Sequence, residues 1–344
     1  MKRFLFSAAL IVADILGFNL IFRRLNAGRI RVLMYHGVTD TKLPSVYWLM
    51  VPAAEFRRQM SYLKPHYRVM PVSVLGDEDP RGVGKDRYTA IITFDDGLKN
   101  VYTTAWPILK ELELRAVCFV VPGLSIQREQ IWSNRLFEFF LKTAHTHIDL
   151  TSLELEQYQL EASLEQRAAV AAKIIRKLKF SQRHMIEVVL NYLTSHYGSS
   201  TVDTGSPFVL MTADQIRTLA ASREFDIAAH SWRHCILPTL TAAQQREEIS
   251  RSISQLADWR IPPCPVFSYP SGHADNITVS ILKELQVSAA VAADEGLHAD
   301  GDDPYRIRRI SIGSDTSYWE FKARLSGLYY FLMKLTGKWR RNGW

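Results

Sequence analysis

Residues 88–97 read Tyr-Thr-Ala-Ile-Ile-Thr-Phe-Asp-Asp-Gly, an apolar run that ends in two adjacent carboxylates and a glycine. β-Branched and aromatic residues dominate the run, which predicts a buried strand over residues 90–94. Asp95 and Asp96 therefore stand where this strand ends, and Gly97 permits a tight backbone turn after them. A second apolar run, residues 225–229, ends at His230, and His234 follows four residues later.

Carboxylates and imidazoles at the ends of two strands make a candidate metal site. Two imidazoles and one carboxylate suit a divalent ion such as zinc, with a reactive water beside it. The remaining carboxylate could accept the proton of that water, and hydrolysis is the reaction that such a site favours. Each motif alone has a plainer interpretation. The carboxylates could cap the next helix, and the histidines could lie exposed on a helical turn.

The rest of the chain alternates between short apolar runs and helical patterns, which predicts a parallel sheet. Because about eight such units follow one another, a closed barrel is favoured over an open sheet, with the strand ends meeting at one face. Thr212 with Gln215 and Thr241 with Gln244 have capping-box form, which marks the starts of two helices. The predicted strands cover residues 31–35, 67–72, 90–94, 116–121, 225–229, 266–269, 289–293 and 306–312.

Residues 132–205 interrupt this alternation with charged and Ala-rich stretches at helical spacing. We expect a helical insertion there, forming a lid or side wall on a barrel that spans residues 29–316. Residues 1–28 predict an N-terminal hydrophobic helix, and residues 317–344 predict a C-terminal basic amphipathic helix. The latter either covers the barrel or adds a second contact with a membrane.

Composition and charge narrow the class of protein. The chain has 344 residues, of which 47% are hydrophobic and 22% charged, as in globular proteins. Its net charge of +7 suits an anionic membrane, a nucleic acid or an acidic polymer. No compact Lys/Arg run with interleaved aromatics occurs, so we expect no nucleic-acid partner. The cysteines at positions 118, 235 and 264 form no CxxC pair and predict no disulfide framework.

The N-terminal apolar segment, residues 4–22, is just long enough to span a bilayer. Asp14 and Asn19 interrupt it, and a carboxylate in mid-span costs roughly 2.5–3.5 kcal/mol. No convincing cleavage site follows, whereas Arg23 and Arg24 do, so an in-plane or anchoring helix on anionic headgroups is favoured. The alternative is a buried helix packed on the domain. We expect a membrane-associated protein on the cytoplasmic face, with a periplasmic or extracytoplasmic face as the alternative.

The two polar motifs together resemble those of the polysaccharide deacetylases, the NodB-homology proteins of carbohydrate esterase family 4. The motifs are Thr93-Phe94-Asp95-Asp96-Gly97 and His230-Ser231-Trp232-Arg233-His234. The resemblance includes the stretches 34–38 and 267–272 and covers roughly residues 30 to 320 in the same order. It implies a distorted (β/α) TIM-like barrel, a divalent metal, commonly zinc, and removal of N-acetyl groups from amino sugars.

The resemblance also assigns roles by position. Asp95 stands at the position of the family's catalytic base. Asp96, His230 and His234 stand at the positions of its metal ligands. Tyr35, Tyr269, Pro270 and Ser271 lie in the stretches 34–38 and 267–272, and we expect them to bind the substrate.

Two departures from the family pattern concern the base and the general acid. The better-known relatives carry an arginine that positions the base, but Ser268 stands near its place here, so we expect either a different orientation of Asp95 or an altered activity. The late Leu-x-His element, which supplies the general acid in many relatives, is missing, and residues 308–311 stand near its expected position. His36 and His298 are the candidate substitutes.

We therefore expect a metal-dependent hydrolase that removes N-acetyl groups from the amino sugars of a polysaccharide or glycolipid precursor at a membrane surface. One alternative is hydrolysis of small linear or cyclic amides on the same barrel. Another is a non-catalytic glycan-binding domain. Ligand type alone does not choose among zinc, cobalt, nickel and manganese.

Overall fold

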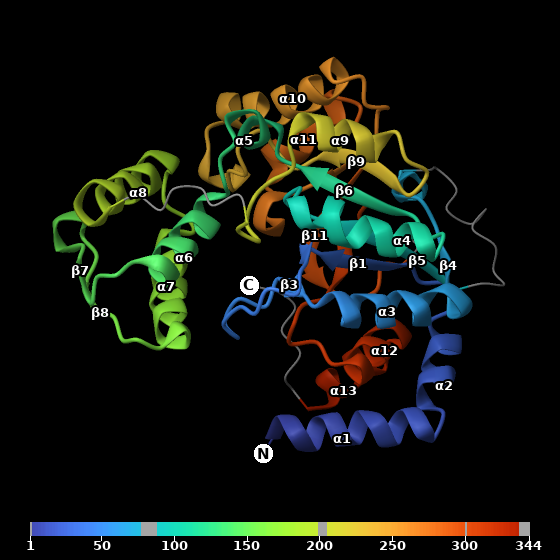
Figure 1. Ribbon diagram of the computed structural model, residues 1–344. Helices are drawn as coiled ribbons and strands as arrows, with labels where there is room; N and C mark the ends of the chain where they lie inside the picture. The colour runs from blue at the N-terminus through green and yellow to red at the C-terminus, as the bar shows by residue number, and fades with distance from the viewer. Residues whose placement is uncertain (1, 77–87, 199–204, 300, 337–344) are drawn as a thin grey trace.

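The structure is a computed structural model that describes residues 2–76, 88–198, 205–299 and 301–336 (Figure 1). Parts of the predicted segments lie outside the described residues. They are residue 1 of the N-terminal helix, residues 77–87 and 300 of the barrel, residues 199–204 of the insertion and residues 337–344 of the C-terminal helix.

Seven parallel strands form the centre of the molecule and pair in the order β10-β11-β12-β1-β5-β6-β9. The two strands at the ends of this order, β9 and β10, contact each other, so the sheet curls into a nearly closed barrel, as predicted. Residues 67–72 contribute only the short strand β4 (Arg68–Val69), which pairs with β5 outside this order. The barrel strands are β1 (Arg31–Tyr35), β5 (Thr89–Phe94), β6 (Ala116–Val120), β9 (Phe225–Ala229), β10 (Val266–Ser268), β11 (Ala289–Glu295) and β12 (Ile307–Ser311).

Side chains along each strand alternate between the barrel interior and the layer under the helices. On β1, Val32 belongs to the interior cluster, whereas Leu33 packs in the outer layer. On β5, Ile91 and Ile92 divide in the same way. This alternation decides which side chains can reach a site inside the barrel mouth.

Helices cover the outside of the barrel and form the larger apolar core with its strands. Two helices begin at the predicted capping boxes, in which Thr212 and Thr241 accept from the N3 backbone and the N3 glutamines bond back. The covering helices are α3 (Ala53–His66), α4 (Trp106–Glu111), α5 (Pro122–Gln127), α9 (Ala213–Ala220), α10 (Ala242–Asp258) and α11 (Asn276–Glu284).

The insertion forms a lobe beside the barrel, at the left in Figure 1. It contains the helices α6 (Trp132–Lys142), α7 (Leu164–Leu178) and α8 (Arg183–Tyr197). Consecutive helices were predicted, but a hairpin of β7 (His147–Asp149) and β8 (Gln157–Gln159) lies between α6 and α7. The pairing follows from burial, because Ile148 and Tyr158 face each other across the hairpin and both are buried.

Four short helices lie together along one side of the barrel, at the bottom of Figure 1. The two termini were each predicted to form one helix, but each contains a break at a glycine with positive φ, Gly17 at 80° and Gly327 at 92°. Within the described residues no single helix is long and apolar enough to cross a bilayer. Residues 6–15 and 18–25 reach that length only as a pair bent by 81°. The helices are α1 (Lys2–Ile15), α2 (Phe18–Leu25), α12 (Tyr318–Ser326) and α13 (Leu328–Leu335).

Candidate metal centre and active site

Asp96, His230 and His234 come together where β5 and β9 end, as the sequence predicted. The Nε2 atoms of His234 and His230 lie 3.3 Å and 3.6 Å from Oδ1 of Asp96. One ligand atom from each of the three residues lies within 4.8 Å of the others. All three side chains are largely buried, which keeps the group in place.

The spacing of these atoms fits a shared divalent ion better than direct hydrogen bonds. A charge-assisted N–H to carboxylate bond spans about 2.7–2.9 Å, which is shorter than either separation here. Two ligands about 2.0–2.1 Å from a tetrahedral zinc ion stand roughly 3.4 Å apart. Two imidazoles and one carboxylate also leave a fourth position for water or substrate. The residues therefore fit a catalytic divalent ion.

The backbone at the cluster adopts conformations that non-glycine residues seldom use. Asp96 has φ 75° and His234 has φ 58°, both in the left-handed region. Gly97 follows at φ 74°, and a Cβ atom there would stand 3.1 Å from a Val120 side-chain carbon. Such strained positions persist where the surrounding structure holds them, and they gather at functional sites.

A backbone carbonyl fixes the orientation of the His230 ring. Nδ1 of His230 lies 2.8 Å from the carbonyl oxygen of Ser268, which can only accept, so Nδ1 carries a hydrogen and donates it. In the neutral ring, Nε2 then presents its lone pair on the side of Asp96. Metal-binding histidines are commonly held by an outer partner of this kind.

Asp95 lies beside this cluster and is gripped by Arg309 from β12. Nη1 of Arg309 donates to Oδ1 at 2.8 Å, and Nη2 donates to Oδ2 at 2.7 Å. The Ser268 hydroxyl donates to Oδ1 at 3.2 Å. Burial alone would raise the pKa of Asp95, but the charge and hydrogen bonds of Arg309 outweigh it and hold this pKa below its usual value. Asp95 is therefore an ionised carboxylate at neutral pH.

Arg309 is the functional residue that the sequence analysis missed. Better-known relatives place such an arginine near position 268; in this chain the arginine that holds Asp95 comes from β12 instead of β10. Arg309 is 1% exposed, and its Nε donates to the carbonyl oxygen of Ala292 at 2.7 Å. The signal was available in the alternation along β12, because Arg309 stands two residues after the interior residue Ile307 and shares its face.

The structure does not bring the two predicted substrate-binding tyrosines to the cluster. Tyr35 is fully buried in the outer layer, where its hydroxyl donates to Oε1 of Gln59 at 2.8 Å. Tyr269 is 1% exposed, and its hydroxyl donates to the carbonyl oxygen of Tyr305 at 3.0 Å. Both stand at positions whose side chains point outward from the barrel in the alternation along their strands. Pro270 and the partly exposed Ser271 form a 3-10 turn directly after Tyr269.

The two candidate general acids lie at different ends of the barrel. His36 directly follows β1 at the end where Asp95 and Asp96 lie, and both carboxylates act on it electrostatically. Burial lowers the pKa of His36 despite the pull of these carboxylates. His298 instead pairs through its backbone with Ile30, which precedes β1, and its Nδ1 lies 3.8 Å from Oδ2 of Asp302. The structure therefore does not bring His298 to the cluster.

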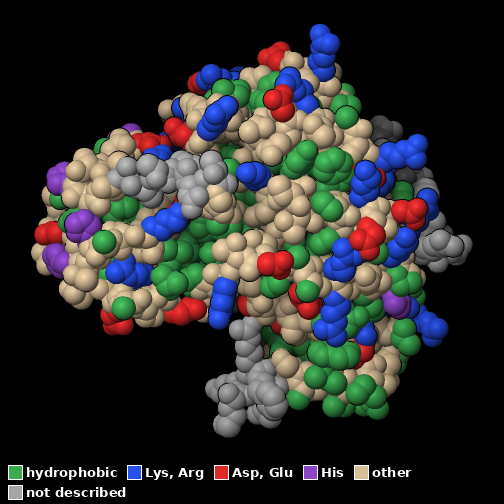
Figure 2. Space-filling view, in the orientation of Figure 1, with side chains coloured by type: hydrophobic (Ala, Val, Ile, Leu, Met, Phe, Trp, Pro, Cys, Tyr) green, Lys and Arg blue, Asp and Glu red, His purple; other side chains and the backbone are tan. Residues whose placement is uncertain are grey.

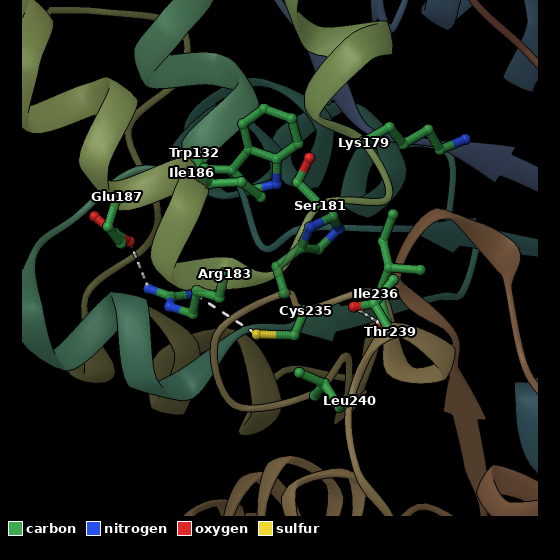
Figure 3. A pocket seen from close by; sticks show the side chains of 11 residues that line it. Trp132, Lys179, Ser181, Arg183, Ile186, Glu187, Cys235, Ile236, Thr239 and Leu240 are labelled. Carbon is green, nitrogen blue, oxygen red and sulfur yellow. Dashed lines mark hydrogen bonds and ion pairs between the residues drawn. The ribbon is translucent and has the colours of Figure 1, made fainter. Parts of the chain in front are cut away.

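A pocket opens next to His234, between the insertion and the loop that follows β9 (Figure 3). Trp132 and Lys179 from the insertion line it. Arg183 donates to the carbonyl oxygen of Arg233 at 3.1 Å, which ties α8 to the loop that carries His234. Arg183 also pairs with Glu187 at 3.0 Å. The insertion thus forms one wall of the pocket beside His234.

Known proteins are similar to this chain in sequence. A family model described as polysaccharide deacetylase matches residues 82–290, more than half of the chain. The protein YxkH of Bacillus subtilis (strain 168) is 25% identical over 179 residues, 51% of this chain and 60% of that protein. The poly-beta-1,6-N-acetyl-D-glucosamine N-deacetylase of Escherichia coli (strain K12) is 22% identical over 298 residues, 85% of this chain and 38% of that protein. The chain thus spans less than two thirds of either relative.

Solved structures share the fold at low sequence identity. The deacetylase PplD of Streptococcus pyogenes, in complex with acetate, has a TM-score of 0.57 and 16% identity, and the match covers 86% of this chain and 98% of that one. IcaB from Ammonifex degensii has a TM-score of 0.56 and 17% identity over 87% of this chain and 97% of that one. Since the family model spans both ligand motifs on this barrel, the chain belongs to the polysaccharide deacetylase family.

Proposed function

We propose that the protein is a metal-dependent N-deacetylase that removes acetyl groups from the amino sugars of a polysaccharide or a glycolipid precursor. One observation supports the proposal above all: a group that fits a metal ion contains Asp96, and an ionised carboxylate, Asp95, stands next to it in the sequence. Asp96 joins His230 and His234 in a group that fits a divalent ion, and Asp95 next to it is held ionised by Arg309. Ligands and base thus occupy one barrel mouth.

A divalent ion in this group, with zinc the first candidate, would polarise the acetamide carbonyl and activate a water. Asp95 is the general base, because it is ionised and its carboxylate is fixed by two hydrogen bonds from Arg309. His36 directly follows β1 at the same rim and is the proposed donor of the proton that the departing amine needs; because burial favours its neutral ring, it would first take up the proton that Asp95 accepts from the water. Ser271 lies on the turn after β10 and is the proposed backbone contact for the substrate.

The proposed substrate is an N-acetylated polymer that lies along the pocket beside His234. An aromatic and a cationic side chain, Trp132 and Lys179, line this pocket and suit a sugar chain. The E. coli relative named for poly-beta-1,6-N-acetyl-D-glucosamine supports this polymer as the first one to test. We further propose that the protein acts at an anionic membrane surface.

Acetate release from that polymer by the purified, metal-loaded protein tests the proposal. We expect acetate from the wild type, and a loss of at least about 100-fold in Asp95→Asn, in line with the weight of a general base. His230→Ala should lose both acetate release and bound metal, whereas Asp95→Asn should keep its metal. Asp258→Asn, an exposed carboxylate on α10, is the control and should match the wild type.

Two other outcomes would point to the alternative functions. Activity on small acetamides or cyclic amides, without activity on acetylated sugars, would favour an amide hydrolase on the same barrel. Binding of the polymer with equal and negligible acetate release from the wild type and the Asp95→Asn variant would favour a glycan-binding domain.

A further inference from the structure

Exposed hydrophobic side chains are concentrated on the terminal helices. Sixteen large hydrophobic residues are exposed in the part of the chain that the structure describes, and nine of them lie on α1, α2, their connection and α13. In Figure 2 hydrophobic side chains gather along the lower edge, where Figure 1 places α1. We call these nine residues the terminal patch: Val12, Ile15, Leu16, Phe18, Leu20, Ile21, Leu25, Phe331 and Leu335.

The terminal patch is one continuous surface, because the helices that carry it pack against one another. The rings of Phe22 on α2 and Phe331 on α13 have centroids 5.0 Å apart. Leu10 on α1 is 1% exposed and joins Ala323 and Leu328 in a small core of its own. The opposite side of α1 and α2 has no such cover among the described residues.

The polar residues of the N-terminal segment face the protein instead of the terminal patch. Asp14 forms an ion pair with Lys322 of α12, and Asn19 accepts a hydrogen bond from the Ser326 hydroxyl at 2.7 Å. The Asn19 amide also donates to Asp14 at 2.8 Å. These contacts hold the 81° bend between the two helices. Straightening the pair to cross a bilayer would break them and carry Asp14 into hydrocarbon at a large cost.

Positive charge is concentrated in the two terminal segments of the sequence, and the rest of the chain carries no positive excess. Residues 1–29 and 328–344 contain nine Lys/Arg and one acidic residue, whereas residues 30–327 contain 33 Lys/Arg and 34 acidic residues. The entire net charge of +7 therefore originates in the two terminal segments. Arg24 on α2, Lys334 on α13 and Arg29, four residues after α2, are exposed. An apolar face with a basic rim is the pattern of helices that lie in the plane of an anionic membrane.

We infer that α1, α2 and α13 together form a docking surface for an anionic lipid bilayer, which they enter from one side without spanning it. The nine apolar side chains enter the acyl boundary, and the basic residues contact headgroup phosphates. This bilayer would be the membrane at which the proposed deacetylase acts. Docking itself does not depend on that activity. The docking surface and the metal centre use different residues, so each can fail without the other.

Co-sedimentation of the full chain with vesicles tests the inference. The vesicles contain phosphatidylcholine alone, or phosphatidylcholine with phosphatidylglycerol. We expect binding to the anionic vesicles that weakens as salt rises. The variant Ile15→Glu/Leu25→Glu changes side chains that are 76% and 73% exposed. It should bind at least about tenfold more weakly, since two apolar groups that would enter the acyl boundary become charged. The matched control, Leu164→Glu/Val188→Glu on the insertion, alters side chains that are 53% and 43% exposed and should bind as the wild type does.

Three results would overturn the inference. One is no sedimentation of the wild type with either vesicle, and another is equal binding by both double variants. The third is a wild-type dimer in vesicle-free buffer that Ile15→Glu/Leu25→Glu dissociates, which would assign the terminal patch to a second copy of the chain. Thermal melting confirms that each variant is folded. Loss of acetate release with vesicle binding intact would count against the proposed chemistry alone.

Discussion

Arg309 of β12 holds both carboxylate oxygens of Asp95 inside the barrel mouth. The two hydrogen bonds are 2.8 Å and 2.7 Å long, and the side chains are 1% and 4% exposed. A bidentate arginine fixes both the position and the rotation of a carboxylate, which a lysine cannot do. We therefore expect Arg309 to act as a positioning residue, through Asp95.

Replacing Arg309 with lysine should separate positioning from charge. We expect kcat to fall about 10–100-fold, the range for lost outer partners of a catalytic group, with little change in KM or bound metal. The control is Arg306→Lys, because Arg306 is an arginine near the start of the same strand whose side chain is 68% exposed. Steady-state kinetics and metal analysis provide the measurement. A fall in metal content that parallels the fall in kcat would contradict a positioning role.

Removing the guanidinium entirely should also destabilise the fold. Arg309→Met leaves the Asp95 carboxylate buried without its partner, and breaking such a pair costs about 3–5 kcal/mol of unfolding free energy. The double variant Asp95→Asn/Arg309→Met removes the stranded charge and should recover much of that loss. Urea unfolding of the wild type, both single variants and the double variant measures the coupling. Strictly additive losses would show that the two side chains do not interact energetically.

The ligand cluster and most of the barrel could be predicted because their signals are local. Each barrel strand is a short apolar run, and the capping boxes at Thr212 and Thr241 show directly which residues begin a helix. Asp96, His230 and His234 stand at strand ends, and parallel strands bring their ends to one rim. The sequence therefore predicts that they converge without any knowledge of the contacts between them.

What the sequence analysis missed depends on the direction of a side chain. Tyr35 and Tyr269 stand near the rim, but strand alternation turns both away from it, so proximity in sequence was misleading. Arg309, in contrast, points into the barrel. Its long side chain reaches Asp95 from a strand two positions away in the sheet. The break at Gly17 also depends on packing, because Asp14 and Asn19 contact α12 on either side of the bend.

Metal binding should stabilise the wild type and not the ligand variants. An ion that binds only the folded state at 1,000 times its Kd adds about 4 kcal/mol to the unfolding free energy. Chelation should therefore lower the Tm of the wild type and leave His230→Ala and His234→Ala unchanged. His196→Ala, an exposed histidine on α8, is the control and should respond as the wild type does. A Tm that is indifferent to chelator in the metal-loaded wild type would refute the site.

The wall formed by the insertion should contribute to substrate binding more than to the chemical step. Trp132 lines the pocket beside His234, and its indole offers a large apolar face with a polar N–H against which a sugar ring can pack. Trp132→Ala should raise KM for the polymer by about three- to tenfold with kcat nearly unchanged, and Trp132→Phe should recover part of the loss. Kinetics on the polymer and on a single acetylated sugar supply the comparison. A drop in kcat with KM unchanged would place Trp132 in the chemistry instead.

Acid should reduce the contribution of the Asp275 helix cap to the stability of the fold. Asp275 is the N-cap of α11, where its Oδ1 accepts from the backbone N–H of Thr278 at 2.8 Å. Burial raises the pKa of Asp275, but the hydrogen bonds from Thr278 and Gln245 outweigh it and leave the pKa below its usual value.

A carboxyl group whose pKa is lower in the folded protein stabilises it at pH values above the unfolded pKa, and this stabilisation is lost as the pH falls through the folded pKa. Asp275→Ala should therefore cost about 0.5–2 kcal/mol at pH 7, the usual worth of an N-cap, and markedly less near pH 3. Asp275→Asn keeps an uncharged cap, so its stability relative to Asp275→Ala should not depend on pH. Urea unfolding at both pH values gives the comparison. An equal cost of Asp275→Ala at pH 7 and pH 3 would mean that the charge of Asp275 does not stabilise α11.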